Sequence, residues 1–128
     1  MECIYMKKDR MSLEGQAAIV TGAGAGIGRA ICIALAEHGA SVIAADMNED
    51  NAKETVKMVQ ENGGKAEAVK VNVTDAGDVE AMVNRAVELY GRIDLLYNNA
   101  GICTVSEIET MPEKWWDSIF AVNCKGVF

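Results

Sequence analysis

The feature that most constrains this chain is a cluster of glycines between a short apolar run, residues 17–20, and a helical pattern, residues 27–35. Within seven residues the cluster contains Gly22, Gly24, Gly26 and Gly28. A turn this tight needs residues that tolerate positive φ, and a phosphate approaches the backbone closely only where Cβ atoms are absent. The free N–H groups at the start of the following helix attract anions. The cluster therefore predicts a phosphate-binding turn between a strand and a helix.

The rest of the sequence continues this alternation of short apolar strands and amphipathic helices. Branched and alternating apolar residues predict strands at 17–20, 41–45, 66–73 and 93–97. The first three helices are expected to end at His38, Asn62 and Tyr90, each followed by a glycine that stops the helix. Asp75 is the predicted N-cap of the third helix.

A fourth helix is predicted near the end of the sequence. Thr110 and Glu113 form a T-x-x-E capping box, with Pro112 in the first helical turn. The helix behind the box carries Trp115, Trp116, Ile119, Phe120, Val122 and Val127. Because these apolar residues lie on more than one side, we expect the helix to pack against a partner as well as its own sheet, and we expect a homo-oligomer.

Strands that alternate with helices predict an α/β fold. The expected architecture is a Rossmann-type doubly wound parallel sheet of about four strands in the order 3-2-1-4. A ligand crevice is expected where the order reverses, between the first and fourth strands. The chain stops at Phe128 inside an apolar helix, so we expect the sheet to be incomplete. Residues 1–12 are interpreted as a flexible leader, and residues 13–128 as the N-terminal part of a nucleotide-binding domain.

Charge and cysteine usage exclude several classes of partner. The net charge of −7 argues against nucleic acid and anionic membranes. No apolar run is long enough to span a bilayer, and the N-terminus has no apolar core of a secretory signal. The cysteines, Cys3, Cys32, Cys103 and Cys124, form no C-x-x-C pair, and His38 is the only histidine. We therefore predict no metal site and reduced thiols, as in a cytoplasmic protein.

An aspartate at the end of the second predicted strand makes the glycine cluster more specific. Asp46 follows Gly28 by eighteen positions. A carboxylate at this place accepts both hydroxyl protons of an adenosine ribose and repels a 2′-phosphate. The predicted cofactor is therefore NAD rather than NADP. The alternatives are a solvated loop carboxylate for Asp46 and, for Arg29, a phosphate contact that favours NADP.

Two segments with asparagine follow. Residues 98–101, N-N-A-G, follow the carboxyl end of the fourth predicted strand and are expected to face the same crevice. Their small residues let a cofactor lie close, and their amides can tie neighbouring strands, although an ordinary turn has the same composition. Asn123 stands between Val122 and Cys124 in the apolar helix. It is either a solvent-facing residue or a buried amide that holds a water or a catalytic side chain.

Together these segments resemble the classical short-chain dehydrogenase/reductase family. The resemblance rests on T-G-A-G-A-G-I-G at 21–28, Asp46, N-N-A-G at 98–101 and V-N-C-K-G at 122–126, and covers roughly residues 13–128. It implies an oxidoreductase that transfers hydride between nicotinamide and a small secondary alcohol or ketone. It also implies a cofactor site made of Thr21, Gly22, Gly26, Ile27, Gly28, Asp46, Met47, Asn72, Val73, Asn98, Ala100 and Gly101.

The resemblance assigns particular roles to two asparagines. It implies that Asn123 is the catalytic asparagine, which supports a proton-relay water. Asn72 stands where the family usually has an aspartate that touches adenine, and its amide oxygen is expected to accept from the adenine amine.

The family's catalytic serine and Tyr-x-x-x-Lys pair follow the asparagine helix, and this sequence ends before them. None of Tyr5, Tyr90 and Tyr97 has a lysine four residues later. In the family the tyrosine is the general acid/base, and the lysine lowers its pKa. We therefore expect the N-terminal half of an NAD-dependent enzyme, which alone binds NAD weakly and turns over nothing.

Two other hypotheses stay open. One is an inactive dinucleotide-binding or subunit-interaction module that acts through the helix at 115–128. The other is a sugar-nucleotide epimerase of the extended family, which the N-N-A-G segment at 98–101 argues against.

Overall fold

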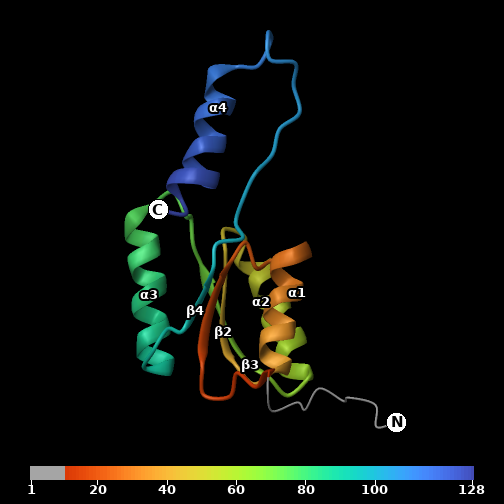
Figure 1. Cartoon of the computed structure of the whole chain (residues 1–128), viewed down its shortest axis with the longest axis vertical. Helices are drawn as coiled ribbons and strands as arrows, with labels where there is room; N and C mark the ends of the chain where they lie inside the picture. Colours follow the sequence, from red (N-terminus) through yellow and green to blue (C-terminus); the bar gives the residue numbers. More distant parts are fainter. Residues whose placement is uncertain (1–10) are drawn as a thin grey trace, which may run out of the picture.

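The computed structural model describes residues 11–128, so the leader predicted for residues 1–12 lies outside the described residues apart from Met11 and Ser12. Figure 1 shows a sheet flanked by helices, with α4 standing beyond the carboxyl ends of the strands. The elements are β1 (Ala17–Thr21), α1 (Gly26–Glu37), β2 (Ser41–Asp46), α2 (Glu49–Glu61), β3 (Lys65–Lys70), α3 (Ala76–Tyr90), β4 (Leu95–Tyr97), α4 (Glu113–Phe120) and the π-helical turn η2 (Ala121–Lys125).

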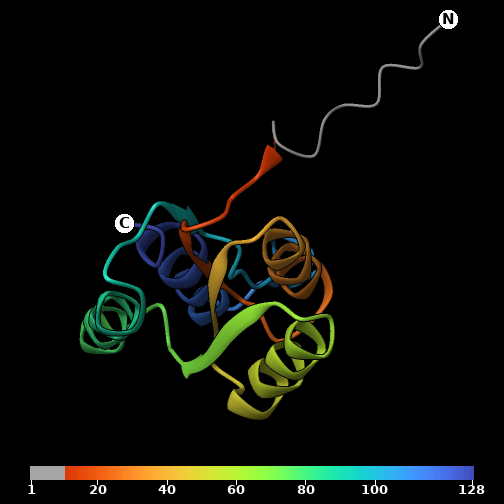
Figure 2. The ribbon, with the colours of Figure 1, turned by 90° about the horizontal axis from the view of Figure 1, so that it is seen from below.

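The four strands form one parallel sheet in the order β3-β2-β1-β4. In the register of this sheet, Ile19 of β1 lies between Ile43 of β2 and Leu96 of β4. Figure 2 shows α1 and α2 on one face of the sheet and α3 on the other. This confirms the predicted Rossmann-type doubly wound sheet and its order 3-2-1-4.

The core lies on both faces of the sheet, because β1 is buried along its whole length. Ala18 and Val20 belong to the cluster beneath α1 and α2, which includes Cys32. Ile19, between them in sequence, packs in the opposite cluster with Met82 of α3. Successive side chains of a strand point to opposite faces, so a short run of apolar residues serves both layers.

Polar side chains begin two of the helices. The Asn48 side chain accepts a hydrogen bond from the Asn51 N–H (3.1 Å) at the start of α2. Asp75 accepts from the Asp78 N–H (3.0 Å) at the start of α3, as predicted for this cap. Both caps bind N–H groups that have no partner within the helix.

The capping box predicted before α4 is wrong. Pro112 is the N-cap and makes no side-chain cap, and the Thr110 hydroxyl donates instead to the Glu107 carbonyl (3.3 Å). The residue before a proline is disfavoured in helical conformation, so Met111 cannot belong to a first turn that contains Pro112. The helix therefore begins at Glu113.

Two strands are shorter than predicted. Strand β3 ends at Lys70, because the Asn72 amide oxygen accepts from the Thr74 N–H (3.1 Å) and closes a turn that takes the chain out of the sheet. Strand β4 begins at Leu95 rather than residue 93. The preceding Asp94 carboxylate accepts from the Ala17 N–H (2.8 Å) and anchors the start of β1.

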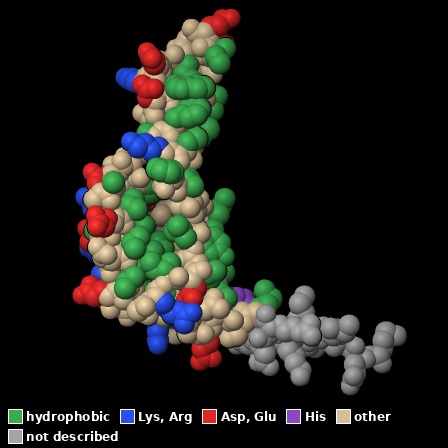
Figure 3. All heavy atoms as spheres, turned by 60° about the vertical axis from the view of Figure 1, so that its left-hand side comes forward, with side chains coloured by type: hydrophobic (Ala, Val, Ile, Leu, Met, Phe, Trp, Pro, Cys, Tyr) green, Lys and Arg blue, Asp and Glu red, His purple; other side chains and the backbone are tan. Residues whose placement is uncertain are grey.

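Helix α4 carries apolar side chains that the described residues leave uncovered. None of its residues is buried, and Trp116 stacks on Phe120 with ring centroids 4.5 Å apart. Figure 3 shows hydrophobic side chains along this upper segment and down the face of the molecule below it. Of the helices within residues 11–128, none has the length and apolarity needed to cross a membrane.

Candidate functional site

A cavity of about 190 Å³ lies at the carboxyl ends of the strands, where the strand order reverses. Seven of the residues predicted for the cofactor site line it: Gly22, Asp46, Met47, Asn72, Val73, Ala100 and Gly101. Ala45, Val71, Ile102 and Val122, which were not predicted, complete the lining. They are apolar residues without a chemical signature of their own, so only the fold places them here.

The glycine turn is closed by backbone packed on backbone. Gly22 and Gly26 have positive φ, +65° and +52°. A Cβ on Gly28 would lie 2.0 Å from the Gly22 carbonyl oxygen, and a Cβ on Gly22 would lie 2.9 Å from Ala100 Cα. Neighbouring atoms of the protein already occupy the places where these Cβ atoms would lie, so the turn packs this closely only because both residues are glycine.

Asp46 has its carboxylate held by two backbone amides. The Gly24 N–H donates to Oδ2 and the Asn48 N–H donates to Oδ1, each at 2.8 Å. Since a carboxylate oxygen accepts two hydrogen bonds, each oxygen retains capacity for a further donor. The two carboxylate oxygens of Asp46 can therefore accept hydrogen bonds from two neighbouring hydroxyl groups, while the negative charge of the carboxylate repels a phosphate.

The start of α1 is suited to an anion. Its first turn contains no acidic residue, and its N-cap, Ala25, makes no side-chain cap. Gly26 and Ile27 are exposed there, with 73% of Ile27 accessible. The helix N-terminus therefore offers its N–H groups and positive dipole end to a phosphate.

The strand tie predicted for residues 98–101 is made by Asn99. Its amide nitrogen donates to the carbonyls of Thr21 (3.0 Å) and Gly22 (3.2 Å). The buried Thr21 hydroxyl in turn accepts from the N–H groups of Asn99 (3.2 Å) and Ala100 (3.1 Å). Thr21 thus supports the site by holding the backbone of Asn99 and Ala100, and it does not line the cavity.

Asn98 lies apart from the cavity that contains Asp46. It is exposed and lines a different cavity, between β4 and α3, with Leu96 and Val83. Asn98 therefore does not share the role of Asn99, whose side chain bonds the glycine turn. Neither asparagine is among the residues that line the cavity with Asp46.

Asn123 lies in the π-helical turn η2 and fastens it to the loop after β4. Its amide oxygen accepts from the Ile102 N–H and its amide nitrogen donates to the Ile102 carbonyl, both at 2.9 Å. A Cβ on Gly101 would lie 3.4 Å from the Asn123 Oδ1, so the side chain reaches the rim of the cavity. Single π-helical turns inside helices occur often at functional sites.

Asn72 has both lone pairs of its amide oxygen engaged. They accept from the Thr74 N–H (3.1 Å) and the Thr74 hydroxyl (2.8 Å). An adenine amine can reach this oxygen only if the hydroxyl turns away. The predicted contact therefore requires a rearrangement of Thr74, which the sequence pattern did not indicate.

Other places in residues 11–128 fit a ligand less well. A hollow of about 480 Å³ is lined by Glu14, His38 and Lys65 among others, but it lies at the amino ends of the strands, opposite the usual ligand site of such sheets. Within the described part of the chain, no group of three or more His, Cys, Asp or Glu side chains is placed to hold a metal ion.

Comparison with known proteins identifies the family of the chain. The model of the short chain dehydrogenase family matches residues 16–128. The chain is 42% identical over 118 residues to the 3-oxoacyl-[acyl-carrier-protein] reductase FabG of Thermotoga maritima, covering 92% of this chain and 48% of that protein. It is 40% identical over 116 residues to 3beta-hydroxysteroid dehydrogenase 2 of Eggerthella lenta, covering 90% and 45%.

The fold has a similar relative among solved structures. A hydroxysteroid dehydrogenase from Escherichia coli superposes with a TM-score of 0.88 at 36% sequence identity, over 93% of this chain and 50% of the other. The chain therefore spans about half the length of the relatives that it matches.

Proposed function

The chain belongs to the short chain dehydrogenase family, and from this membership we propose that it forms the cofactor-binding half of an NAD-dependent oxidoreductase. The observation that carries the proposal is the Asp46 carboxylate, which two backbone N–H groups hold at the wall of the cavity. Its free acceptor capacity suits the two hydroxyls of an adenosine ribose, and its charge disfavours the 2′-phosphate of NADP.

The residues around the cavity fit the remaining parts of the cofactor. Met47, Val73 and Ala100 offer an apolar wall to the adenine ring. Gly22, Gly26, Ile27 and Gly28 would receive the pyrophosphate at the start of α1, where no acidic side chain competes for the helix dipole. When bound, the nicotinamide ring supplies the site that accepts or releases a hydride.

The reaction of the whole protein is part of the same proposal. The relatives include a reductase and dehydrogenases by name, so we propose hydride transfer to or from a small secondary alcohol or ketone. Asn123 would hold the loop at Ile102 and support a proton-relay water at the rim of the cavity. Because the 128 residues contain no Tyr-x-x-x-Lys, we expect no turnover from this chain by itself.

Two finer points belong to the proposal. The stacked and exposed Trp116 and Phe120 of α4 favour association with a second copy. The same surface favours the alternative of a subunit-interaction module, which predicts association without nucleotide. We place the protein in the cytoplasm, because Cys32, Cys103 and Cys124 are free thiols, the state that a reducing compartment maintains.

Calorimetric titration of the chain with NAD and with NADP tests the cofactor. We expect NAD to bind more tightly than NADP. Asp46→Asn should weaken the affinity for NAD by roughly 10–100-fold, the value of hydrogen bonds to a charged group, and should weaken the affinity for NADP less. Asp117→Asn in the exposed α4 is the matched control and should leave both affinities unchanged. Equal affinities for the two nucleotides in the unaltered chain would overturn the proposal.

A further inference from the structure

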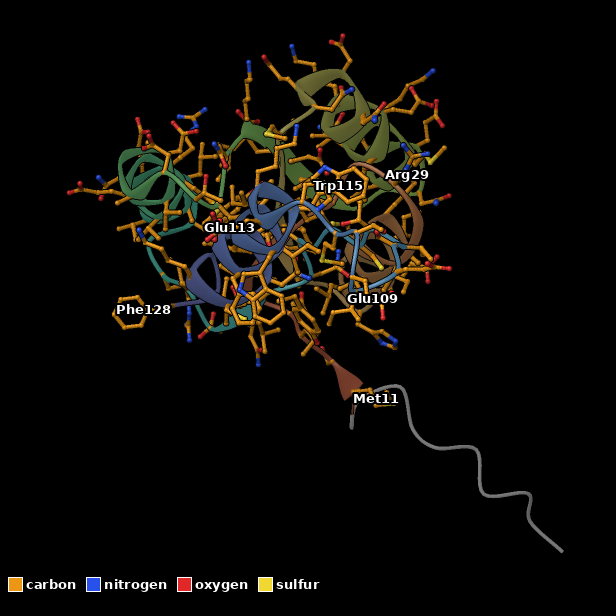
Figure 4. The ribbon with its side chains drawn as sticks, turned by 90° about the horizontal axis from the view of Figure 1, so that it is seen from above. Met11, Arg29, Glu109, Glu113, Trp115 and Phe128 are labelled. Carbon is orange, nitrogen blue, oxygen red and sulfur yellow. The ribbon has the colours of Figure 1, made fainter. Side chains whose placement is uncertain are left out.

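Two side chains outside the cavity hold the backbone that in turn holds Asp46. The Thr55 hydroxyl of α2 donates to the Ala23 carbonyl (2.8 Å), and the Arg29 guanidinium of α1 donates to the Gly24 carbonyl. Arg29 Nε also donates to Thr55 Oγ1 (3.0 Å). Figure 4 shows Arg29 on the side of the molecule where α1 and α2 lie next to each other.

The contact with Thr55 acts on one particular peptide plane. The Ala23 carbonyl and the Gly24 N–H belong to the same planar, trans peptide unit and point in opposite directions. One end of this unit is bonded to Thr55 and the other to Asp46 Oδ2, each at 2.8 Å. Rotation of the unit breaks both bonds together, so the buried hydroxyl fixes the direction of the N–H that orients the carboxylate.

Thr55 is an unusual residue for its place. It is fully buried, at 0% exposure, on the face of α2 that also carries the buried Ala52 and Val59. A hydroxyl in such surroundings is costly unless it is hydrogen-bonded. The Thr55 hydroxyl accepts a hydrogen bond from Arg29. It lies within donating distance of two carbonyls, that of Ala23 (2.8 Å) and, more distantly, that of Asn51 in its own helix (3.2 Å). Its shorter carbonyl contact is therefore to the glycine turn and not to α2.

Arg29 directs two of its donor nitrogens, Nε and Nη2, toward Thr55 and the glycine turn. Its guanidinium is directed at Thr55 and the Gly24 carbonyl, within the protein. This arrangement favours a structural role for Arg29 over contact with a 2′-phosphate. A Cβ on Gly24 would lie 2.8 Å from both Asp46 Oδ2 and Asn51 Cβ, so the turn, α2 and the carboxylate meet here without spare space.

We propose that Thr55 and Arg29 are positioning residues that set the preference for NAD over NADP through the Ala23–Gly24 peptide and Asp46, without contact with the cofactor. The inference rests on the proposed function. When the hydroxyl of Thr55 is removed, the Ala23 carbonyl loses its partner, and the peptide holds less firmly the Gly24 N–H that directs the carboxylate toward the ribose. NAD, which uses that carboxylate, then loses more affinity than NADP.

The test compares the ratio of NADP to NAD dissociation constants across matched variants of the chain. Thr55→Val removes the hydroxyl and keeps the branched shape, and Thr55→Ser keeps the hydroxyl. Thr110→Val is the control, because the Thr110 hydroxyl also donates to a backbone carbonyl but lies far along the chain in an exposed turn. We expect Thr55→Val to lower the ratio about fivefold to tenfold, the order of the net contribution of one hydrogen bond between neutral groups. Thr55→Ser and Thr110→Val should keep it.

A double-mutant cycle separates positioning from a general loss of structure. In an Asp46→Asn background, Thr55→Val should lower the ratio no further, because both changes act on one contact. If Thr55→Val does not fold, Arg29→Lys at the partly exposed edge of the network decides, with an expected fall of about threefold, since lysine lacks the fork that bonds two acceptors. Arg85→Lys, which alters only surface ion pairs with Glu67 and Glu88, is its control.

The outcomes distinguish the two proposals. If Asp46→Asn lowers the ratio but Thr55→Val and Arg29→Lys do not, the positioning role is refuted and the NAD site stands. If the unaltered chain shows no preference, or Asp46→Asn leaves the preference intact, the proposed function itself fails, and the inference fails with it.

Discussion

A methyl group at position 28 provides a direct test of how the glycine turn is closed. In Gly28→Ala the new Cβ lies 2.0 Å from the Gly22 carbonyl oxygen and 2.7 Å from the Asn99 amide nitrogen. Carbon and oxygen ordinarily approach to about 3.3 Å, so the Gly22 carbonyl must move by more than 1 Å. That carbonyl accepts the Asn99 bond of 3.2 Å, which the movement breaks.

The size of the effect follows from these contacts. Overpacking costs about 1–3 kcal/mol, and the lost hydrogen bond adds about 0.5–1.5 kcal/mol. The better helix propensity of alanine offsets up to about 1 kcal/mol. We expect the free energy of unfolding to fall by about 1–4 kcal/mol, which corresponds to a Tm lower by roughly 4–15 °C for a chain of this length. Nucleotide affinity should fall as well, because the displaced carbonyl belongs to the turn.

Thermal and urea unfolding, followed by circular dichroism, measure this loss. Gly77→Ala in the first turn of α3 is the matched control: the nearest atom to its Cβ would be Asp75 Oδ1 at 3.1 Å, the end of a side chain that can shift. That variant should remain within about 1 kcal/mol of the unaltered chain or be slightly more stable. If Gly28→Ala unfolds at the same temperature as Gly77→Ala, backbone packing does not close the turn and the reasoning is refuted.

Three further predictions concern the supports of the site and the core. Asn99→Ala should lower the free energy of unfolding by about 1–3 kcal/mol, because it removes two hydrogen bonds to the carbonyls of Thr21 and Gly22. Asn98→Ala, at an exposed position, should change the free energy of unfolding little. Equal losses for the two variants in urea titrations would contradict this prediction. The pKa of Asp94 is lowered by Arg92 and by the Ala17 N–H, so the carboxylate stabilises the fold above the ordinary aspartate pKa of about 4, and this contribution is lost as the pH falls through the lower pKa of the folded state. The difference in stability between the unaltered chain and Asp94→Asn should therefore shrink on acidification. A constant difference would show that ionisation of Asp94 is irrelevant. Burial raises the pKa of Cys32 to about 12, so iodoacetamide at pH 8 should label Cys103 and Cys124 in the folded chain and reach Cys32 only in denaturant, as peptide mass mapping can show.

The arrangement of the sheet could be predicted because its signals are local and agree with one another. Branched residues in β1 and β2, the glycines between β1 and α1, and the glycine after each of the first three helices all indicate the same units. Right-handed crossovers then leave few topologies. Asp46 could be placed at the cavity for the same reason, since the carboxyl ends of parallel strands meet at one edge of the sheet.

The errors arose where two local rules competed. Thr110 and Glu113 satisfy the capping pattern, but Pro112 restricts Met111, and the steric rule prevails over the hydrogen-bonding pattern. At residues 98–101 the composition indicated amides that tie neighbouring strands, and the structure makes this tie with Asn99, while Asn98 lines a different cavity. That choice depends on where β4 ends, which the sequence leaves open by one or two residues.

Thr55 shows a different limit, because its role depends on a contact between residues 32 positions apart. In the sequence Thr55 occupies a core-facing position of α2 between Ala52 and Val59. At such a position the pattern treats a threonine as one more residue of the apolar face and gives no reason to look for a partner of its hydroxyl. Its hydroxyl acquires a function only when the turn after β1 presents the Ala23 carbonyl to it. The shorter carbonyl contact of the buried Thr55 hydroxyl is to a neighbouring loop, and the peptide that it bonds is bonded at its other end to Asp46. The site therefore explains Thr55 better than helix α2 does.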